Sequence, residues 1–235
     1  METVKLERNI GLLSDGVAFV KEKVGILGGA FNPIHLAHLR VVEEVAEYLE
    51  LKKFLFIPAY HPPHKPLKGL VSFEHRLKMV KLAVEGHPFF EASDIEKRLG
   101  GISYTVRTLR ALSGGNVELF CLIGADAFLE IETWWNYREL FELASIVVMT
   151  RPGHSEEALR RLLHEKVSGE FRWIAGERRY SHSRLKSVFI LPVTNLDISS
   201  SRIRESLRQG KSVRFLVPDR VLEYIVKERL YLNGV

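Results

Sequence analysis

The stretch "GGAFNPIHLAHLR" (Gly28–Arg40) decides the fold that we expect for this chain. A short apolar run, Val24–Leu27, precedes it, and apolar residues at helical spacing continue to Leu51. A buried strand, a glycine turn and a helix in this order predict the start of a βαβ unit. The glycines let the backbone approach a ligand closely, and the unpaired N–H groups at the helix start favour an anion.

Two histidines in this stretch, His35 and His38, are one helical turn apart and therefore share a face. Both imidazoles could donate hydrogen bonds to one phosphate. Neither G-x-x-x-x-G-K-[ST] nor G-x-G-x-x-G is present, and without H-E-x-x-H a zinc site is the weaker interpretation. Taken alone, the pair also fits an ordinary helix start with surface histidines.

Strands alternate with helices along the rest of the chain. The expected strands are Val24–Leu27, Lys53–Pro58, Phe89–Ala92, Val117–Ile123, Ile146–Met149, Phe171–Ile174 and Ser187–Val193. The expected helices are Leu36–Leu51, Ser72–Glu85, Ser103–Leu112, Ala127–Leu143 in pieces, Ser155–Val167, Ser200–Gln209 and Pro218–Leu232. This alternation predicts an α/β fold with a Rossmann-like, doubly wound parallel sheet and helices on both faces. We expect residues 1–22 to be an N-terminal extension and residues 23–235 to form a single domain.

Four turns follow expected strands, at Gly28, Pro58, Gly124 and Arg151. Ligands of open parallel sheets bind beyond the carboxyl ends of the strands. We therefore expect these turns to converge on one cleft.

A second candidate anion site is "ISSSRIRESLRQG" (Ile198–Gly210), where serines cluster at a helix start and Arg202 and Arg204 lie just inside it. Hydroxyls, helix N–H groups and a guanidinium together suit a phosphate. Ordinary N-capping by Ser199 or Ser200 is the alternative. Three serines and two arginines exceed what capping requires.

The composition is that of a globular protein of 235 residues, with 46% hydrophobic and 27% charged residues. No apolar run approaches the ~18 residues that a transmembrane helix needs, so we expect no membrane partner. The single cysteine, Cys121, excludes an intrachain disulfide and fits the cytoplasm. Residues 151–220 hold 15 Lys/Arg and 8 Asp/Glu, a charge of +7 against +5 for the whole chain. This basic segment predicts either attraction of phosphates or a solvated face.

Seven motifs in order carry a resemblance to a known family. "GGAFNPIHLAHL" and "ISSSRIR" look like the two signatures of the nucleotidyltransferase superfamily with the H-x-G-H motif. The other five are "IPAYHPPHK" (Ile57–Lys65), "SYTVRTL" (Ser103–Leu109), "LIGADAF" (Leu122–Phe128), "TWW" (Thr133–Trp135) and "RPG" (Arg151–Gly153). Their order and spacing, over about residues 24–232, resemble the bacterial nicotinate-mononucleotide adenylyltransferases.

This resemblance implies transfer of AMP from ATP to nicotinate mononucleotide, which yields nicotinate adenine dinucleotide and pyrophosphate in NAD biosynthesis. The attack would be direct and in line, without a covalent intermediate, so the protein supplies positioning and charge stabilisation. Mg²⁺ would accompany ATP, and an assembly of identical chains stays open. Rival interpretations are an adenylyltransferase acting on nicotinamide mononucleotide or phosphopantetheine, and a nucleic-acid-binding module; we expect no nucleic acid partner.

The resemblance also implies roles for particular residues. The expected catalytic residues are His35, His38 and Arg204. The expected ATP-binding residues are Gly28, Gly29, Ala30, Phe31, His35, His38, Lys65, Gly124, Asp126, Ser199, Ser200 and Arg204. Nicotinate mononucleotide would contact Tyr104, Thr105, Trp134 and Trp135, with Trp134 stacked on the pyridine and the Trp134–Trp135 backbone at the carboxylate. No metal ligands from the protein are expected.

Several of these assignments have structural alternatives. Lys65 could be an exposed lysine, Asp126 could be the N-cap of the following helix, and the tryptophans could belong to the core. The chain also departs from the family pattern. Ala37 stands where the H-x-G-H motif has glycine, and its methyl could crowd a nucleotide. Ser201 and Trp135 stand where threonine and tyrosine are usual.

Overall fold

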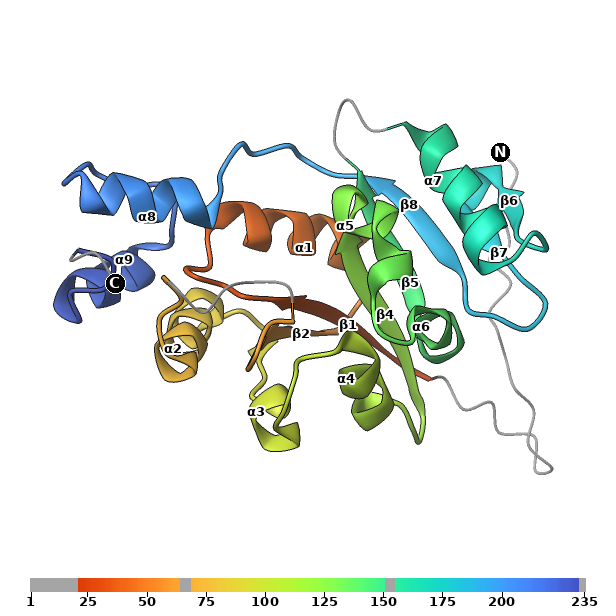
Figure 1. The fold of residues 1–235 in the computed structure, drawn as a ribbon, viewed down its shortest axis with the longest axis horizontal. Helices are drawn as coiled ribbons and strands as arrows, with labels where there is room; N and C mark the ends of the chain where they lie inside the picture. Colours follow the sequence, from red (N-terminus) through yellow and green to blue (C-terminus); the bar gives the residue numbers. More distant parts are fainter. Residues whose placement is uncertain (1–20, 64–68, 151–154, 233–235) are drawn as a thin grey trace, which may run out of the picture.

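The computed structural model describes residues 21–63, 69–150 and 155–232, which form an eight-stranded sheet flanked by helices (Figure 1). The strands are β1 (Glu22–Gly29), β2 (Lys53–Pro58), β3 (Phe90–Ala92), β4 (Val117–Gly124), β5 (Ser145–Thr150), β6 (Arg172–Ile174), β7 (Arg179–Ser181) and β8 (Val188–Pro192). Their order in the sheet is β3-β2-β1-β4-β5-β8-β7-β6. Six neighbouring strands of this sheet pair in parallel, namely β3, β2, β1, β4, β5 and β8. This confirms the predicted doubly wound sheet.

One edge of the sheet corrects the sequence prediction. β7 was not predicted, and both β7 and β6 pair antiparallel to their neighbours. Only residues 175–178 separate β6 from β7, and parallel strands need a crossover of a dozen or more residues. The connection closes with Arg178 in the left-handed region, at φ 45°. A three-residue strand is too short to show a period of two in the sequence.

The helices are α1 (Leu36–Leu49), α2 (Phe73–Val84), α3 (Ile95–Leu99), α4 (Thr105–Leu112), α5 (Ala125–Leu129), α6 (Tyr137–Leu143), α7 (Glu156–Leu162), α8 (Ser200–Arg208) and α9 (Asp219–Lys227). Short 3-10 helices form η1 (Ile131–Thr133) and η3 (Ala175–Glu177), and a π-helix forms η2 (Leu163–Val167). The unpredicted α3 is too short to show a helical period. α9 ends before the predicted Leu232, because Arg229 and Tyr231 adopt positive φ angles. Among the described residues, no helix is long and apolar enough to cross a membrane.

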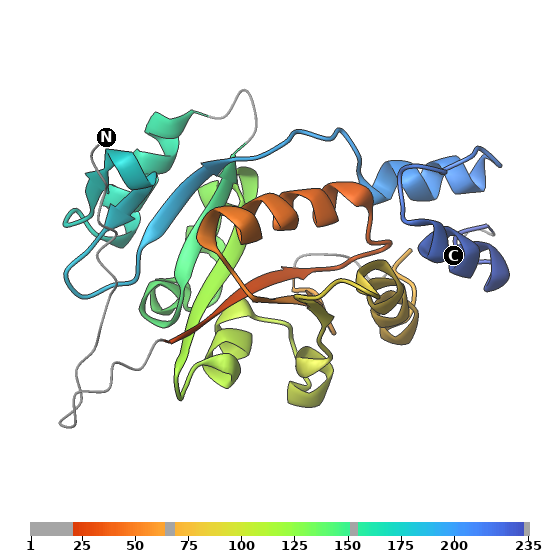
Figure 2. The same ribbon diagram turned by 180° about the vertical axis from the view of Figure 1, so that it is seen from behind.

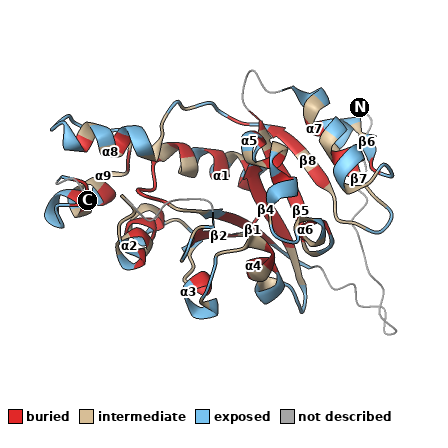
Figure 3. Cartoon of the chain, in the orientation of Figure 1, coloured by how far each residue is buried: buried red, intermediate tan, exposed pale blue. Residues whose placement is uncertain are grey.

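Helices cover both faces of the sheet, as predicted, because side chains alternate along each strand. In β2, Phe54 and Phe56 join the core beneath α1, α2, α8 and α9, whereas Leu55 and Ile57 join the core beneath α3 to α7. Figure 2 shows α1 lying across the first face, and Figure 3 shows the buried residues concentrated in the strands. The sheet is therefore buried on both sides through its centre.

The strand order reverses direction between β1 and β4. These strands pair from Glu22 and Val117 as far as Ile26 and Cys121, and each then continues for three more residues without a pairing partner across this gap. α1 and α5, which follow these strands, pack on opposite faces. In open α/β sheets such a switch point opens a ligand crevice at the carboxyl ends.

The convergence predicted from the turns is confirmed for three of the four positions. Gly29 pairs with Pro58 at the ends of β1 and β2, and Gly124 ends the adjacent β4. Arg151 lies outside the described residues. Within the predicted extension, residues 1–20 also lie outside them, and β1 begins at Glu22.

Candidate active site

The loop between β1 and α1 holds two histidines against each other. His35 is the N-cap of α1, and its ring stacks on that of His38, with centroids 3.6 Å apart and planes at 24°. The backbone N–H of His35 donates to His38 Nδ1 over 3.2 Å. The prediction that both imidazoles lie on one side is confirmed. His35 is buried, whereas His38 is half-buried.

The Phe31 ring packs against the His38 ring of this pair. Its φ of 45° is unusual for a bulky residue, and a conformation of this kind costs energy that the surroundings must offset. The turn sends the ring into the core, where it meets His38 edge-on at 5.1 Å. The Phe31 side chain is therefore occupied by packing, so only its backbone is available to a ligand.

The start of α8 docks on the same loop. The Ser200 hydroxyl donates to the Pro33 carbonyl over 2.8 Å, and Arg204 Nη1 donates to the Asn32 carbonyl over 2.8 Å. Ser199 caps α8 by accepting from the Arg202 N–H at 3.3 Å. The capping alternative thus holds for Ser199, while Ser200 and Arg204 join the two predicted anion sites into one.

The Arg204 side chain carries a buried donor that the described part of the protein does not satisfy. Its Nε is buried and has no hydrogen-bond partner among the described residues. Burial lowers the pKa of the Arg204 guanidinium, because removing the group from water disfavours its charge. A phosphate bound here would supply both the acceptor and the opposite charge.

Two glycines keep the mouth of the crevice open. Gly28 and Gly124 are exposed near the ends of β1 and β4, and a Cβ on either would meet no atom within 4 Å. Asp126 lies inside the first turn of α5, whose N-cap is Gly124. The alternative interpretation of Asp126 as an N-cap is therefore wrong.

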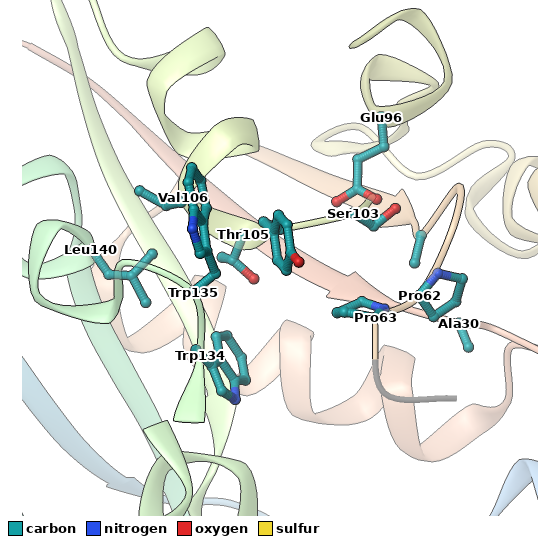
Figure 4. A pocket seen from close by; sticks show the side chains of 13 residues that line it. Ala30, Pro62, Pro63, Glu96, Ser103, Thr105, Val106, Trp134, Trp135 and Leu140 are labelled. Atoms are coloured by element: carbon teal, nitrogen blue, oxygen red, sulfur yellow. The ribbon is translucent and has the colours of Figure 1, made fainter. Parts of the chain in front are cut away.

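An apolar cavity of about 230 Å³ lies beside this crevice (Figure 4). Its lining residues are Gly29, Ala30, Ala59, Pro62, Pro63, Glu96, Ser103, Tyr104, Thr105, Val106, Trp134, Trp135 and Leu140. All four residues that we predicted to contact the pyridine nucleotide are among them. Thr105 is the first residue of α4, so the N-terminus of that helix lines the cavity.

The two tryptophans play different parts. Trp135 is 48% exposed, and its ring packs against Tyr104 with centroids 5.0 Å apart. Trp134 is half-buried against the core, and its backbone N–H already donates to the Ile131 carbonyl over 3.0 Å. Of the two backbone N–H groups that we predicted at a carboxylate, this leaves Trp135 as the candidate donor.

The cavity and the histidine loop share a boundary. Gly29 and Ala30 line the cavity, and the chain continues directly from them to Phe31, Asn32 and His35. Lys65 and the "RPG" motif lie outside the described residues. The backbone at Gly29 and Ala30 therefore joins the aromatic cavity to the loop that carries His35 and His38.

Comparison with known proteins identifies the family. The model of the cytidylyltransferase-like family matches residues 26–206. A protein of Geotalea daltonii named "Probable nicotinate-nucleotide adenylyltransferase" is 47% identical over 214 residues, covering 90% of this chain and 99% of the relative. A protein of the same name from Geotalea uraniireducens is 46% identical, covering 89% and 98%. The chain belongs to the nicotinate-nucleotide adenylyltransferase family. The resemblance seen in the motifs is confirmed.

Solved structures of more distant sequence share the fold. Plasmodium falciparum nicotinic acid mononucleotide adenylyltransferase complexed with NaAD superposes with a TM-score of 0.67, at 18% identity, over 89% of this chain and 97% of that one. The same enzyme complexed with APC gives a TM-score of 0.65. This chain therefore shares its Rossmann-like architecture with these solved structures.

The departure at Ala37 has a simple structural outcome. Ala37 of this adenylyltransferase is only 2% exposed and belongs to the buried face of α1. Protein atoms therefore cover its methyl group. Ser201 keeps a hydroxyl that accepts from Arg204 Nη2 at 3.4 Å.

Arg76 is a supporting residue that the motifs do not include. It is 1% exposed, and it donates to the carbonyls of Ala30 at 2.9 Å and Val71 at 3.1 Å, tying together the loops that follow β1 and β2. Burial lowers the pKa of its guanidinium. A signal was present in the sequence, because Arg76 stands midway between the core residues Phe73 and Met79 of an amphipathic helix.

Glu96 and Ser103 hold the acceptor side together in a similar way. Glu96 accepts from the Tyr60 N–H at 3.2 Å and from the Thr108 hydroxyl at 3.0 Å. Ser103 accepts from the His61 N–H at 2.9 Å and returns its own N–H to the His61 carbonyl at 3.0 Å. The backbone of Tyr60 and His61 after β2 is thereby fixed to the residues around α3 and α4. No local sequence pattern marks Glu96 for this role.

Proposed function

We propose that this chain transfers AMP from ATP to nicotinate mononucleotide, producing nicotinate adenine dinucleotide and pyrophosphate in NAD biosynthesis. The observation that carries the proposal is the shared boundary at Gly29 and Ala30, where the aromatic cavity adjoins the loop that holds His35 and His38 and accepts a hydrogen bond from Arg204. Family membership supports the same reaction, and one relative of known structure is described in complex with NaAD.

The reaction joins two anions, so control of charge is its main requirement. A phosphate oxygen of nicotinate mononucleotide attacks the α-phosphorus of ATP in line, a new P–O bond forms, and the bond to the β-phosphate oxygen breaks. Pyrophosphate leaves with that electron pair. The protein forms no covalent bond, and it accelerates the step by positioning the two phosphates and stabilising the charge between them.

The polar side of the crevice would hold ATP. His35 and His38 bind the phosphates, with His38 at the oxygen of the α-phosphorus, where charge develops. Ser199, Ser200 and Arg204 receive the β- and γ-phosphates through the α8 N-terminus and the guanidinium. The further contacts that we propose are the backbone of Gly28, Gly29, Ala30 and Phe31, the Lys65 ammonium, and Gly124 and Asp126 beside the adenosine.

Mg²⁺ would arrive with ATP as part of the substrate. The described part of the chain contains no group of three or more His, Cys, Asp or Glu side chains that could hold a metal. This arrangement fits an ion that keeps phosphate oxygens and water as its ligands.

The apolar side would hold the nicotinate. Trp134 stacks on the pyridine ring, while Thr105, at the α4 N-terminus, and the Trp135 N–H donate to its carboxylate. Donors alone favour an acid over an amide, because an amide would present its own N–H groups to them. Tyr104 completes the wall beside Trp135.

A pyrophosphate-release assay with ATP and three acceptors tests the proposal. We expect nicotinate mononucleotide to be the best acceptor, nicotinamide mononucleotide to have at least about tenfold lower kcat/KM, and phosphopantetheine to be inactive. Equal kcat/KM for the acid and the amide would contradict the carboxylate contacts. Turnover of phosphopantetheine, or of none of the three, would contradict the assigned reaction.

A further inference from the structure

A buried hydrogen bond links the loop before α1 to the segment after α9. The Tyr231 hydroxyl donates to Asn32 Oδ1 over 2.8 Å, across 199 positions of the sequence. Tyr231 is 7% exposed and Asn32 is 5% exposed. A polar pair buried this deeply depends on its partners, because an unsatisfied buried group costs about 1–3 kcal/mol.

The backbone that carries this side chain adopts an uncommon conformation. Tyr231 has φ 65° and Arg229 has φ 52°, both in the left-handed region that bulky residues rarely adopt. The Tyr231 ring lies in the core beneath α1 and α2. Burial raises the pKa of the hydroxyl well above its usual range, so the group stays a neutral donor.

Asn32 passes this constraint to the phosphate site. Its side chain also donates to the Gly69 carbonyl at 2.8 Å and accepts from the Val71 N–H at 3.3 Å, so both ends of the amide are fixed. Its backbone carbonyl accepts from Arg204 Nη1. The orientation of Asn32 therefore sets the position of one of the two acceptors that the described residues offer the Arg204 guanidinium, the other being the Ser201 hydroxyl.

We propose that Tyr231 is a positioning residue for the ATP-phosphate site, acting through Asn32 on Arg204; this rests on the adenylyl transfer proposed above. None of these three residues lines the acceptor cavity. The hydroxyl should therefore affect ATP and leave nicotinate mononucleotide unaffected. A role in stability alone would not separate the two substrates.

The test is Tyr231→Phe, which keeps the ring and removes only the hydroxyl. We expect the Kd for MgATP, measured by calorimetry without acceptor, to rise roughly two- to tenfold, the equivalent of one lost hydrogen bond. The KM for nicotinate mononucleotide should stay within about twofold. Tyr224→Phe is the matched control, because its hydroxyl on α9 bonds His75 Nδ1 at 2.9 Å. That variant should bind MgATP like the wild type.

A double-mutant cycle tests the route through Asn32. In an Asn32→Ser background, which lacks the amide acceptor, Tyr231→Phe should cause no further loss of MgATP affinity. An undiminished effect in that background, equal losses for both substrates, or unchanged MgATP binding in Tyr231→Phe would each overturn the inference. The ATP measurements need no acceptor, so they are distinct from the wild-type acceptor assay that tests the reaction.

Discussion

The phosphate side and the acceptor cavity differ in burial and in the contacts that hold them. On the phosphate side, His35 and Asn32 are 6% and 5% exposed, and hydrogen bonds to backbone carbonyls connect α8 to the loop before α1. On the acceptor side, Trp135 is 48% exposed and its ring rests on Tyr104. On the phosphate side the cross-links meet at the residues proposed to bind the ligand, whereas the acceptor side presents aromatic rings, of which Trp135 is open to solvent.

This difference follows from what each substrate demands. Stabilising charge in a transition state requires donors that are fixed before the reaction begins, since reorientation costs energy at the decisive moment. Stacking on a ring tolerates small displacements, because the interaction varies slowly with position. We therefore expect changes on the phosphate side to lower turnover, and changes on the acceptor side to affect mainly the KM of the acceptor.

The largest effect is expected for His38→Ala. Loss of a donor at the α-phosphorus should lower kcat by about 10²–10³-fold. Circular dichroism and thermal unfolding should show that the fold persists. The matched control is His87→Ala, since His87 lies before β3, at the amino end of that strand, whereas the site lies at the carboxyl ends. Near-normal adenylyl transfer by the His38 variant would remove this residue from the catalytic role.

A smaller effect should follow from Gly124→Ala, which tests the proposed contact with ATP at the end of β4. Gly124 has φ −65° and ψ 148°, and a Cβ there meets no protein atom, so thermal stability should not change. A methyl in the space that ATP needs should cost about 1–3 kcal/mol of binding, seen as a raised KM for ATP. Gly176→Ala, equally open within η3, is the control. If the two variants bind ATP alike, Gly124 does not adjoin the nucleotide.

The smallest effect is expected for Trp135→Ala. Loss of the aromatic contact with Tyr104 should cost about 0.5–1.5 kcal/mol, seen as a raised KM for nicotinate mononucleotide with the KM for ATP unchanged. Trp173→Ala offers a control, because Trp173 is 44% exposed on β6 at the far edge of the sheet. A fall in kcat as large as that of the His38 variant would show that the two sides are not separable in this way.

Features with a local pattern could be predicted from the sequence. The central strands are short apolar runs. The glycine turn, the serine cluster and the "SYT" and "TWW" motifs are each contiguous in the sequence. The rule that ligands bind beyond the carboxyl ends of the strands then brought Gly28, Pro58 and Gly124 to one crevice.

The supporting residues could not be predicted, because their roles depend on distant partners. Nothing near Tyr231 in the sequence indicates a bond to Asn32, and nothing near Glu96 indicates that it joins Tyr60 to Thr108. The short elements α3 and β7 could not be predicted from the sequence for another reason. Each is shorter than the window in which a helical or strand period can be recognised.

The separation of Asn32 from Tyr231 also bears on the order in which the chain folds. Contacts between residues close in sequence form cheaply, whereas a contact spanning 199 positions closes a very long loop and comes late. The sheet centre and α1 can assemble before it, but Asn32 then lacks the hydroxyl that fixes it. A partly folded chain would therefore display the histidine loop without the fully aimed arginine, and competence for ATP would be among the last properties that folding confers.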